Sequence, residues 1–159
     1  MAPRDGDGWV TCSCGRTHWG KYGAAGLLLV RRDLDVPKVL LQLRAEWTHG
    51  GGTWALPGGA IDSHEESAAA AVREASEEAG VDASRMEVRL THHAACANDE
   101  WFYDTVIAHC DDDAGAHVAN AESVELEWIA IDEVDQRPLH GGFAAAWPVL
   151  RPKILDSLA

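Results

Sequence analysis

The chain has 159 residues, of which 47% are hydrophobic and 25% are charged, and its formal net charge is −13. This length and composition predict one globular domain with a proper hydrophobic core. The acidic balance argues against a groove for polymeric nucleic acid, which would need a basic surface. It does not exclude a small phosphate substrate, because bound metal ions can bridge an acidic protein and an acidic ligand.

We expect residues 1–159 to form a single domain, in which 1–21 make an N-terminal extension or a short hairpin. This segment is polar and lacks the apolar core of a signal peptide, and the longest apolar run, 24–30, is too short to cross a bilayer. We therefore expect a cytoplasmic protein with reduced cysteines and no membrane partner.

Cys12, Cys14 and His18 in the same segment are a candidate zinc site. Structural zinc needs four ligands, but this group offers three, and its C-x-C spacing is shorter than the usual C-x₂-C. A fourth ligand would have to come from elsewhere in the chain. We therefore favour a hairpin with reduced thiols over a zinc site.

The next elements predict a hairpin followed by a loop. Residues 23–32 and 39–43 are apolar runs that predict a buried central strand and its partner. The loop 44–53 contains three glycines and Trp47, and residues 54–56 predict a short strand. Trp47 has two interpretations, because its ring could stack on a substrate base or pack over the edge of the core.

A loop–helix–loop is predicted at 57–81. Residues 65–79 are rich in Ala, Glu and Arg, which favour a helix. Ser63 is the predicted N-cap, and Gly80 is the predicted C-terminal stop.

This predicted helix has two different faces. One is an apolar stripe that would pack against a sheet, formed by Ala68, Val72, Ala75 and Ala79. The other gathers Glu74, Glu77 and Glu78, whose spacing brings like charges together, with Arg73 as the nearest opposite charge. The cluster is either a solvated helix face or a site for a divalent cation. Carboxylate oxygens suit Mg²⁺ or Mn²⁺.

The second half of the chain adds three predicted strands and a helix. The strands are 86–95, 101–110 and 124–131, and the helix is 143–158, with two prolines that limit or kink it. The order strands, helix, strands, helix predicts an α/β domain with a mixed sheet between helices.

Residues 59–81 carry fixed identities at fixed spacing. Five residues separate Gly59 from Glu65, seven more lead to Arg73, and Glu74, Glu77, Glu78 and Gly80 follow. This complete pattern resembles the signature of the Nudix hydrolases. The resemblance implies the Nudix fold, with a mixed sheet in an α/β/α sandwich and the catalytic loop–helix–loop at 57–81. It also implies metal-dependent hydrolysis of a nucleoside diphosphate linked to another group.

The chain is most similar to the mutator-type (MutT-like) Nudix enzymes. That similarity implies cleavage of a nucleoside triphosphate, with oxidised ones included, to the monophosphate and pyrophosphate. Two alternatives stay open: a pyrophosphatase of ADP-ribose or other nucleotide sugars, and a module that binds a nucleotide without cutting it. Many family members form homodimers, so a homodimer is compatible with the resemblance.

The resemblance also assigns roles to residues around the motif. The Gly58 carbonyl and the carboxylates of Glu74, Glu77 and Glu78 would bind Mg²⁺ or Mn²⁺. Glu65 and Arg73 would orient that cluster. Gly59 and Trp47 complete the predicted set as substrate-binding residues.

A further acidic ligand usually comes from a later loop in this family. Glu122 lies at the matching offset ahead of the Glu127–Trp128 pair, and Glu125 and Glu100 are the alternatives. The general base stays open among Glu74, Glu78 and Glu122.

Overall fold

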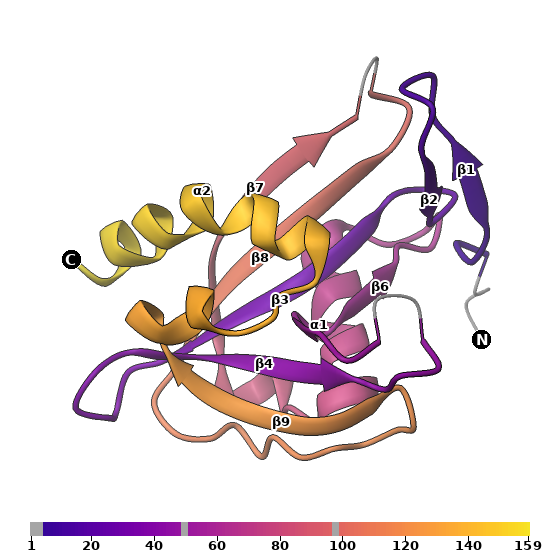
Figure 1. Ribbon diagram of the computed structural model, residues 1–159. Helices are drawn as coiled ribbons and strands as arrows, with labels where there is room; N and C mark the ends of the chain where they lie inside the picture. Colours follow the sequence, from indigo (N-terminus) through magenta and orange to yellow (C-terminus); the bar gives the residue numbers. More distant parts are fainter. Residues whose placement is uncertain (1–4, 49–50, 97–98) are drawn as a thin grey trace.

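The computed structural model describes residues 5–48, 51–96 and 99–159 (Figure 1). The elements in chain order are β1 Trp9–Thr11, β2 Thr17–Trp19, β3 Ala24–Arg31, β4 Lys38–Arg44, β5 Trp54–Ala55, β6 Gly58–Ala60, α1 Ser67–Ala79, η1 Ala83–Arg85, β7 Glu87–Ala95, β8 Phe102–Cys110, β9 Ser123–Ala130, η3 Ile131–Gln136 and α2 Gly141–Leu158. Each strand and helix predicted from the sequence is present. The short strand β6 is an addition, at the place where the sequence predicted the first loop of the loop–helix–loop.

Seven of the strands form one mixed sheet with β3 at its centre. β3 runs parallel to β8 and antiparallel to β4 and β6. The sheet continues from β4 to β5 and β9, and from β8 to β7. All residues of β3 except the last are buried, as the unbroken apolar run predicted.

Helices cover both faces of this sheet, with α2 in front and α1 behind in Figure 1. On one face, α1 buries Ala70, Ala71 and Ala75 against apolar residues of β3 and β8. On the other, α2 buries Phe143, Trp147, Leu150 and Ile154. The predicted α/β/α sandwich is confirmed.

The start of α1 differs from the prediction, whereas its end agrees. The helix begins at Ser67 with Glu66 in the N-cap position, so the prediction that Ser63 caps it is wrong. The backbone N–H of Ser63 instead donates to the Asp5 carboxylate at 2.8 Å. Gly80 ends the helix in a left-handed conformation with φ 64°, which glycine adopts at no steric cost.

The two prolines of α2 do not limit it. Pro148 and Pro152 lie inside a continuous helix. Both are exposed, so the carbonyl groups that lose a helical partner there can bond to water instead.

The N-terminal hairpin expected within 1–21 is also present. β1 and β2 pair antiparallel as a separate two-stranded sheet. The hairpin lies beside the turn between β7 and β8 (Figure 1). Trp101 joins the two parts, because its indole N–H donates to the Trp19 carbonyl at 3.2 Å and its ring stacks on His18 with centroids 4.1 Å apart.

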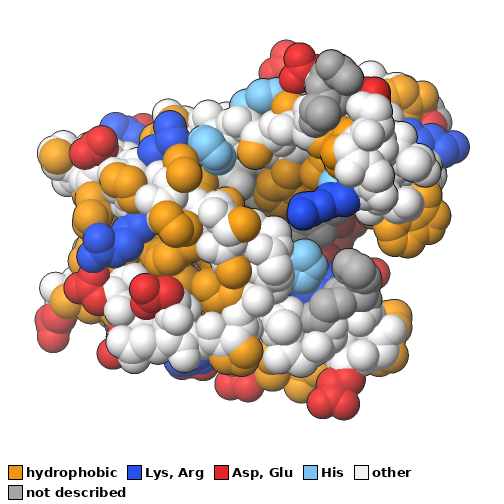
Figure 2. Space-filling view, turned by 45° about the horizontal axis from the view of Figure 1, so that its top comes forward, with side chains coloured by type: hydrophobic (Ala, Val, Ile, Leu, Met, Phe, Trp, Pro, Cys, Tyr) orange, Lys and Arg blue, Asp and Glu red, His pale blue; other side chains and the backbone are white. Residues whose placement is uncertain are grey.

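The described surface mixes side-chain types. On the face shown in Figure 2, basic side chains are scattered among acidic and hydrophobic ones and do not line a continuous groove. Within the described ranges, no helix combines the length and the apolar character that a membrane span requires.

Candidate active site

Glu78 lies at the centre of the predicted site. It is 3% exposed, and its carboxylate accepts a hydrogen bond from the Gly58 N–H at 2.8 Å. Glu74, one turn earlier on α1, is also buried. Glu122 shares a hydrogen bond with Glu78 from the loop before β9. The fold thus brings Gly58, Glu74, Glu78 and Glu122 together from separate parts of the chain.

This environment raises the pKa of Glu78 to about 9. Burial is the largest cause, since it removes the water that would solvate the charged carboxylate. The hydrogen bond with Glu122 and the charge of Glu74 act in the same direction, and the Gly58 N–H only partly opposes them. Without a cation, the cluster therefore disfavours full ionisation.

Arg73 is the hub that holds the neighbouring carboxylates. Its guanidinium donates two hydrogen bonds to Glu65, at 2.7 and 2.8 Å, and one to Glu74 at 2.8 Å. A further bond to the Ala60 carbonyl at 3.1 Å ties it to the loop before the helix. These bonds hold the pKa of the Glu65 carboxyl below its usual range. Such contacts suit the orienting role predicted for Arg73 and Glu65.

Two glycines allow the backbone to come close to these groups. A Cβ at Gly59 would stand 2.7 Å from the carboxyl carbon of Glu74, so a side chain there would displace that carboxylate. A Cβ at Gly58 would stand 2.5 Å from the Ala25 carbonyl oxygen on β3. Gly58 therefore requires glycine for packing against the backbone of β3, whereas a side chain at Gly59 would force the Glu74 carboxylate to shift.

The donor set fits a hard divalent cation. Glu74, Glu78 and Glu122 offer only oxygen atoms, and these are the ligands that Mg²⁺ and Mn²⁺ prefer. Glu77 lies at the solvent edge of the cluster, with a side chain that is 44% exposed and 3.5 Å from Arg73. A bound cation would compensate the carboxylate repulsion that raises the pKa of Glu78.

The remaining predicted residues are more dispersed. Trp47 is 71% exposed, so the interpretation that it packs over the core edge is wrong, and stacking on a base stays a prediction. Of the alternatives to Glu122, Glu100 accepts the Ser13 N–H of the N-terminal hairpin at 2.6 Å, and Glu125 is exposed on β9. Neither therefore takes the place of Glu122 beside Glu78.

Sequence reasoning missed Tyr103 and Arg44 near this site. Burial and the charge of Glu78 raise the pKa of the Tyr103 phenol, and the charge of Arg44 acts in the opposite direction. The Tyr103 hydroxyl reaches this place over Gly26, where a Cβ would stand 2.0 Å from it. No sequence spacing links β8 to α1, and the parallel pairing of β3 with β8 creates the proximity.

The loop–helix–loop against the sheet, with its glutamates held by one arginine, defines a Nudix hydrolase. Residues 21–150 match the family model of the NUDIX domain, so the chain belongs to the Nudix family. The identification made from the motif at 59–81 is thereby confirmed.

Particular relatives place the chain among the MutT-like members. It is 56% identical over 155 residues to the "Putative 8-oxo-dGTP diphosphatase 3" of Mycobacterium tuberculosis strain H37Rv. The aligned region covers 92% of this chain and 70% of that relative. It is 40% identical over 162 residues to a "Nucleoside triphosphate pyrophosphatase/Nudix hydrolase fusion protein" of Bifidobacterium longum. That aligned region covers 97% of this chain and 32% of the relative.

A solved structure agrees with the fold. The crystal structure of RenU, a Nudix hydrolase from M. smegmatis, superposes with a TM-score of 0.87 at 47% identity, over 95% of this chain and 96% of that one. The C. elegans Ap4A hydrolase, at 16% identity and a TM-score of 0.68, shares the fold.

Proposed function

We propose that this protein hydrolyses a nucleoside triphosphate, with oxidised ones such as 8-oxo-dGTP included, to the monophosphate and pyrophosphate. The observation that carries the proposal is the buried pair Glu74 and Glu78 beside Gly58, joined by the exposed Glu122, whose charge a divalent cation would balance. The names of the M. tuberculosis and B. longum relatives support the substrate class. A cytoplasmic location and a homodimer stay predictions.

A bound Mg²⁺ or Mn²⁺ would supply positive charge to the pyrophosphate oxygens and make a water molecule more acidic. Glu74, Glu77, Glu78, Glu122 and the Gly58 carbonyl are the groups that would hold it. Arg73 and Glu65 keep Glu74 in place through the bonds described above. One of Glu74, Glu78 and Glu122 takes the proton from the attacking water.

Arg44 and Trp47 supply recognition next to this chemistry. Arg44 ends β4, and its backbone is bonded to Thr53 and Gly52 at 2.9 Å, which fixes its position. Its positive charge suits the phosphate groups. Trp47 follows in the same loop with an exposed ring on which a purine base can stack. Gly59 completes this set, because the absence of a side chain there leaves room for the Glu74 carboxylate beside it.

The experiment is a nucleotide panel that includes 8-oxo-dGTP, the four ordinary deoxynucleoside triphosphates, ADP-ribose and NADH, with Mg²⁺ or Mn²⁺ in ¹⁸O-labelled water. We expect a triphosphate to be the best substrate, with pyrophosphate rather than phosphate released. Mass spectrometry of the products shows which phosphorus receives the labelled oxygen.

Two outcomes would contradict the proposal in different ways. Preferential cleavage of ADP-ribose would identify the protein as a nucleotide-sugar pyrophosphatase, and the assignment of the metal ligands would still hold. Tight nucleotide binding without turnover would show that the protein binds a nucleotide and does not cleave it. The variant Glu78→Gln is the matched control, because it removes one charge from the site while keeping the size of the side chain.

A further inference from the structure

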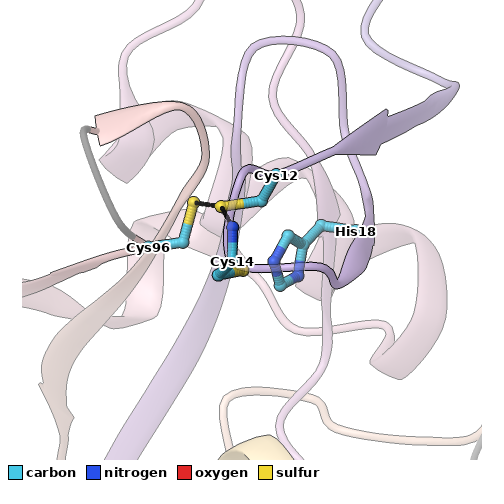
Figure 3. Close-up of side chains that lie close together, drawn as sticks. All are labelled: Cys12, Cys14, His18 and Cys96. Carbon is cyan, nitrogen blue, oxygen red and sulfur yellow. Dashed lines mark hydrogen bonds between the residues drawn. The ribbon is translucent and has the colours of Figure 1, made fainter.

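A second group of metal-ligating side chains meets outside the glutamate site. Cys12, Cys14 and His18 come from the N-terminal hairpin, and Cys96 follows β7 (Figure 3). Each offers one ligand atom, and these four atoms all lie within 4.8 Å of one another. The sulfurs of Cys12 and Cys96 are 2.6 Å apart although 84 positions separate them in sequence. The fold thus supplies the fourth ligand that the sequence alone did not show.

We propose that Cys12, Cys14, His18 and Cys96 bind one structural zinc ion that fastens the N-terminal hairpin to the β7–β8 turn. Three cysteines and one histidine are a donor set of structural zinc, and four protein ligands leave no open position for catalysis. Zn–S bonds of about 2.3 Å place tetrahedral ligand sulfurs about 3.8 Å apart. The Cys12 and Cys96 sulfurs would therefore separate slightly, and more distant pairs would draw together.

The histidine gives an independent indication of a ligand. Its Nε2 atom is buried and has no hydrogen-bond partner. An unsatisfied buried nitrogen costs about 1–3 kcal/mol, so native structures rarely keep one without a reason. The ring is held in place by stacking on Trp101, at 4.1 Å and an interplanar angle of 6°. A bond to zinc would give this nitrogen a partner without moving the ring out of its stack.

The hairpin loop is shaped to bring Cys12 and Cys14 to one ion despite their short spacing. The N–H of Cys14 donates to the Cys12 sulfur at 3.4 Å, which holds the two residues on the same side of the loop. The loop is closed by bonds from Gly15 N to the Cys12 carbonyl and from Cys12 N to the Arg16 carbonyl, both at 2.9 Å. Gly15 has φ 89°, which favours glycine at this turn.

The other side of the site is fixed as well. The N–H of Cys96 donates to the Trp101 carbonyl at 2.8 Å, and the Glu100 carboxylate accepts the Ser13 N–H at 2.6 Å. These bonds hold Cys96 against the hairpin. Because thiolates and imidazole select soft or borderline metals, this site would take zinc while the glutamates take Mg²⁺ or Mn²⁺.

Zinc would solve a stability problem of the hairpin. Strands of three residues without a larger sheet are marginal in water. The hairpin also leaves Trp9 61% and Trp19 42% exposed, so it has little apolar burial of its own. Metal binding that occurs only in the folded arrangement adds its free energy to folding.

The test begins with the zinc content of the full chain, purified without a histidine tag and desalted, by inductively coupled plasma mass spectrometry. We expect about one zinc ion per chain, since structural zinc survives desalting. Cys14→Ser and Cys96→Ser should each lose most of it. Cys110→Ser is the matched control, because this buried cysteine lies outside the cluster, and it should keep the zinc.

Two further measurements separate this site from the others. Glu78→Gln should keep the zinc, which shows that the glutamates do not hold it. Cobalt-loaded protein should show the absorption bands of a tetrahedral thiolate site, and these bands should weaken in Cys14→Ser. Circular dichroism confirms that each variant is folded.

The proposal is overturned if the chain neither retains zinc nor binds added zinc more tightly than Cys14→Ser does. It is equally overturned if mass spectrometry of alkylated, unreduced protein finds a Cys12–Cys96 disulfide. It also fails if Cys110→Ser, folded, loses zinc as completely as Cys14→Ser.

Discussion

Replacement of Glu78 by glutamine should stabilise the cation-free protein while abolishing its activity. Glutamine has nearly the size of the protonated carboxyl group. Its carbonyl can accept the Gly58 N–H, and its amide can donate to Glu122, so the contacts of Glu78 are kept. What changes is the charge that a buried carboxylate would carry.

The magnitude follows from the pKa of Glu78, which is about 9 in the folded protein against 4.5 for an unperturbed glutamate. Because the folded pKa is raised, the folded state binds the proton more tightly, and stability falls as pH rises from about 4.5 towards 9. Each pH unit in that window costs about 1.4 kcal/mol, which gives about 3 kcal/mol at pH 7. Glu78→Gln removes this cost.

The assay is urea unfolding at pH 5, 7 and 8, after dialysis into buffer without divalent cations and without a chelator. We expect Glu78→Gln to exceed the wild type by about 1 to 3 kcal/mol at pH 7 and by little at pH 5. With saturating Mg²⁺ the order should reverse, since ligand that binds only the folded state stabilises the wild type more.

Glu77→Gln is the matched control, because its side chain is 44% exposed and belongs to the same cluster. It should lower activity without the pH-dependent gain in stability. The reasoning is refuted if Glu78→Gln destabilises the cation-free protein at pH 7, or if its advantage does not change between pH 5 and pH 8. Near-normal turnover of Glu78→Gln at saturating Mg²⁺ would refute the metal assignment.

Three other substitutions test the surroundings of the cluster. Arg73→Lys should cost about 2 kcal/mol in urea unfolding, because the single ammonium nitrogen of lysine cannot replace the two parallel bonds to Glu65 together with the bond to Glu74. A loss below about 0.5 kcal/mol would contradict the central role of Arg73. Gly59→Ala should raise the Mg²⁺ concentration needed for half-maximal rate roughly tenfold, because the added Cβ displaces the Glu74 carboxylate. An unchanged midpoint in a titration of rate against Mg²⁺ would argue against Glu74 as a metal ligand. Trp47→Ala should raise KM roughly tenfold with unchanged melting temperature, because its exposed ring contributes only through stacking, and an unchanged KM would exclude that contact.

The part of the site that the sequence predicted is the part set by local spacing. Glu74 and Glu78 are one helical turn apart, so any helix over this segment brings them together. Gly80 marked the helix end because few residues adopt its left-handed conformation. The prediction that Glu122 lies beside Glu78 could not be made from local spacing. It came from an offset ahead of the Glu127–Trp128 pair that is typical of the family.

The parts that the sequence did not predict depend on contacts between distant segments. Ser63 looked like an N-cap because its chemistry fits one, but Asp5 from the N-terminal segment competes for it. Tyr103 lies on β8 and Cys96 lies just after β7, and the neighbours of both strands depend on the order of strands in the sheet. Cys96, the fourth member of the proposed zinc site, was missed because it lies far from Cys12, Cys14 and His18 in the chain.

The hairpin and the glutamate site are physically connected, although their ligand chemistry keeps them distinct. The N–H of Gly6, just before β1, donates to the Asp62 carboxylate at 2.9 Å, and the N–H of Asp62 donates to Glu65 at 3.0 Å. Glu65 in turn binds Arg73, which holds Glu74. A hairpin fastened by zinc would therefore steady the loop before α1.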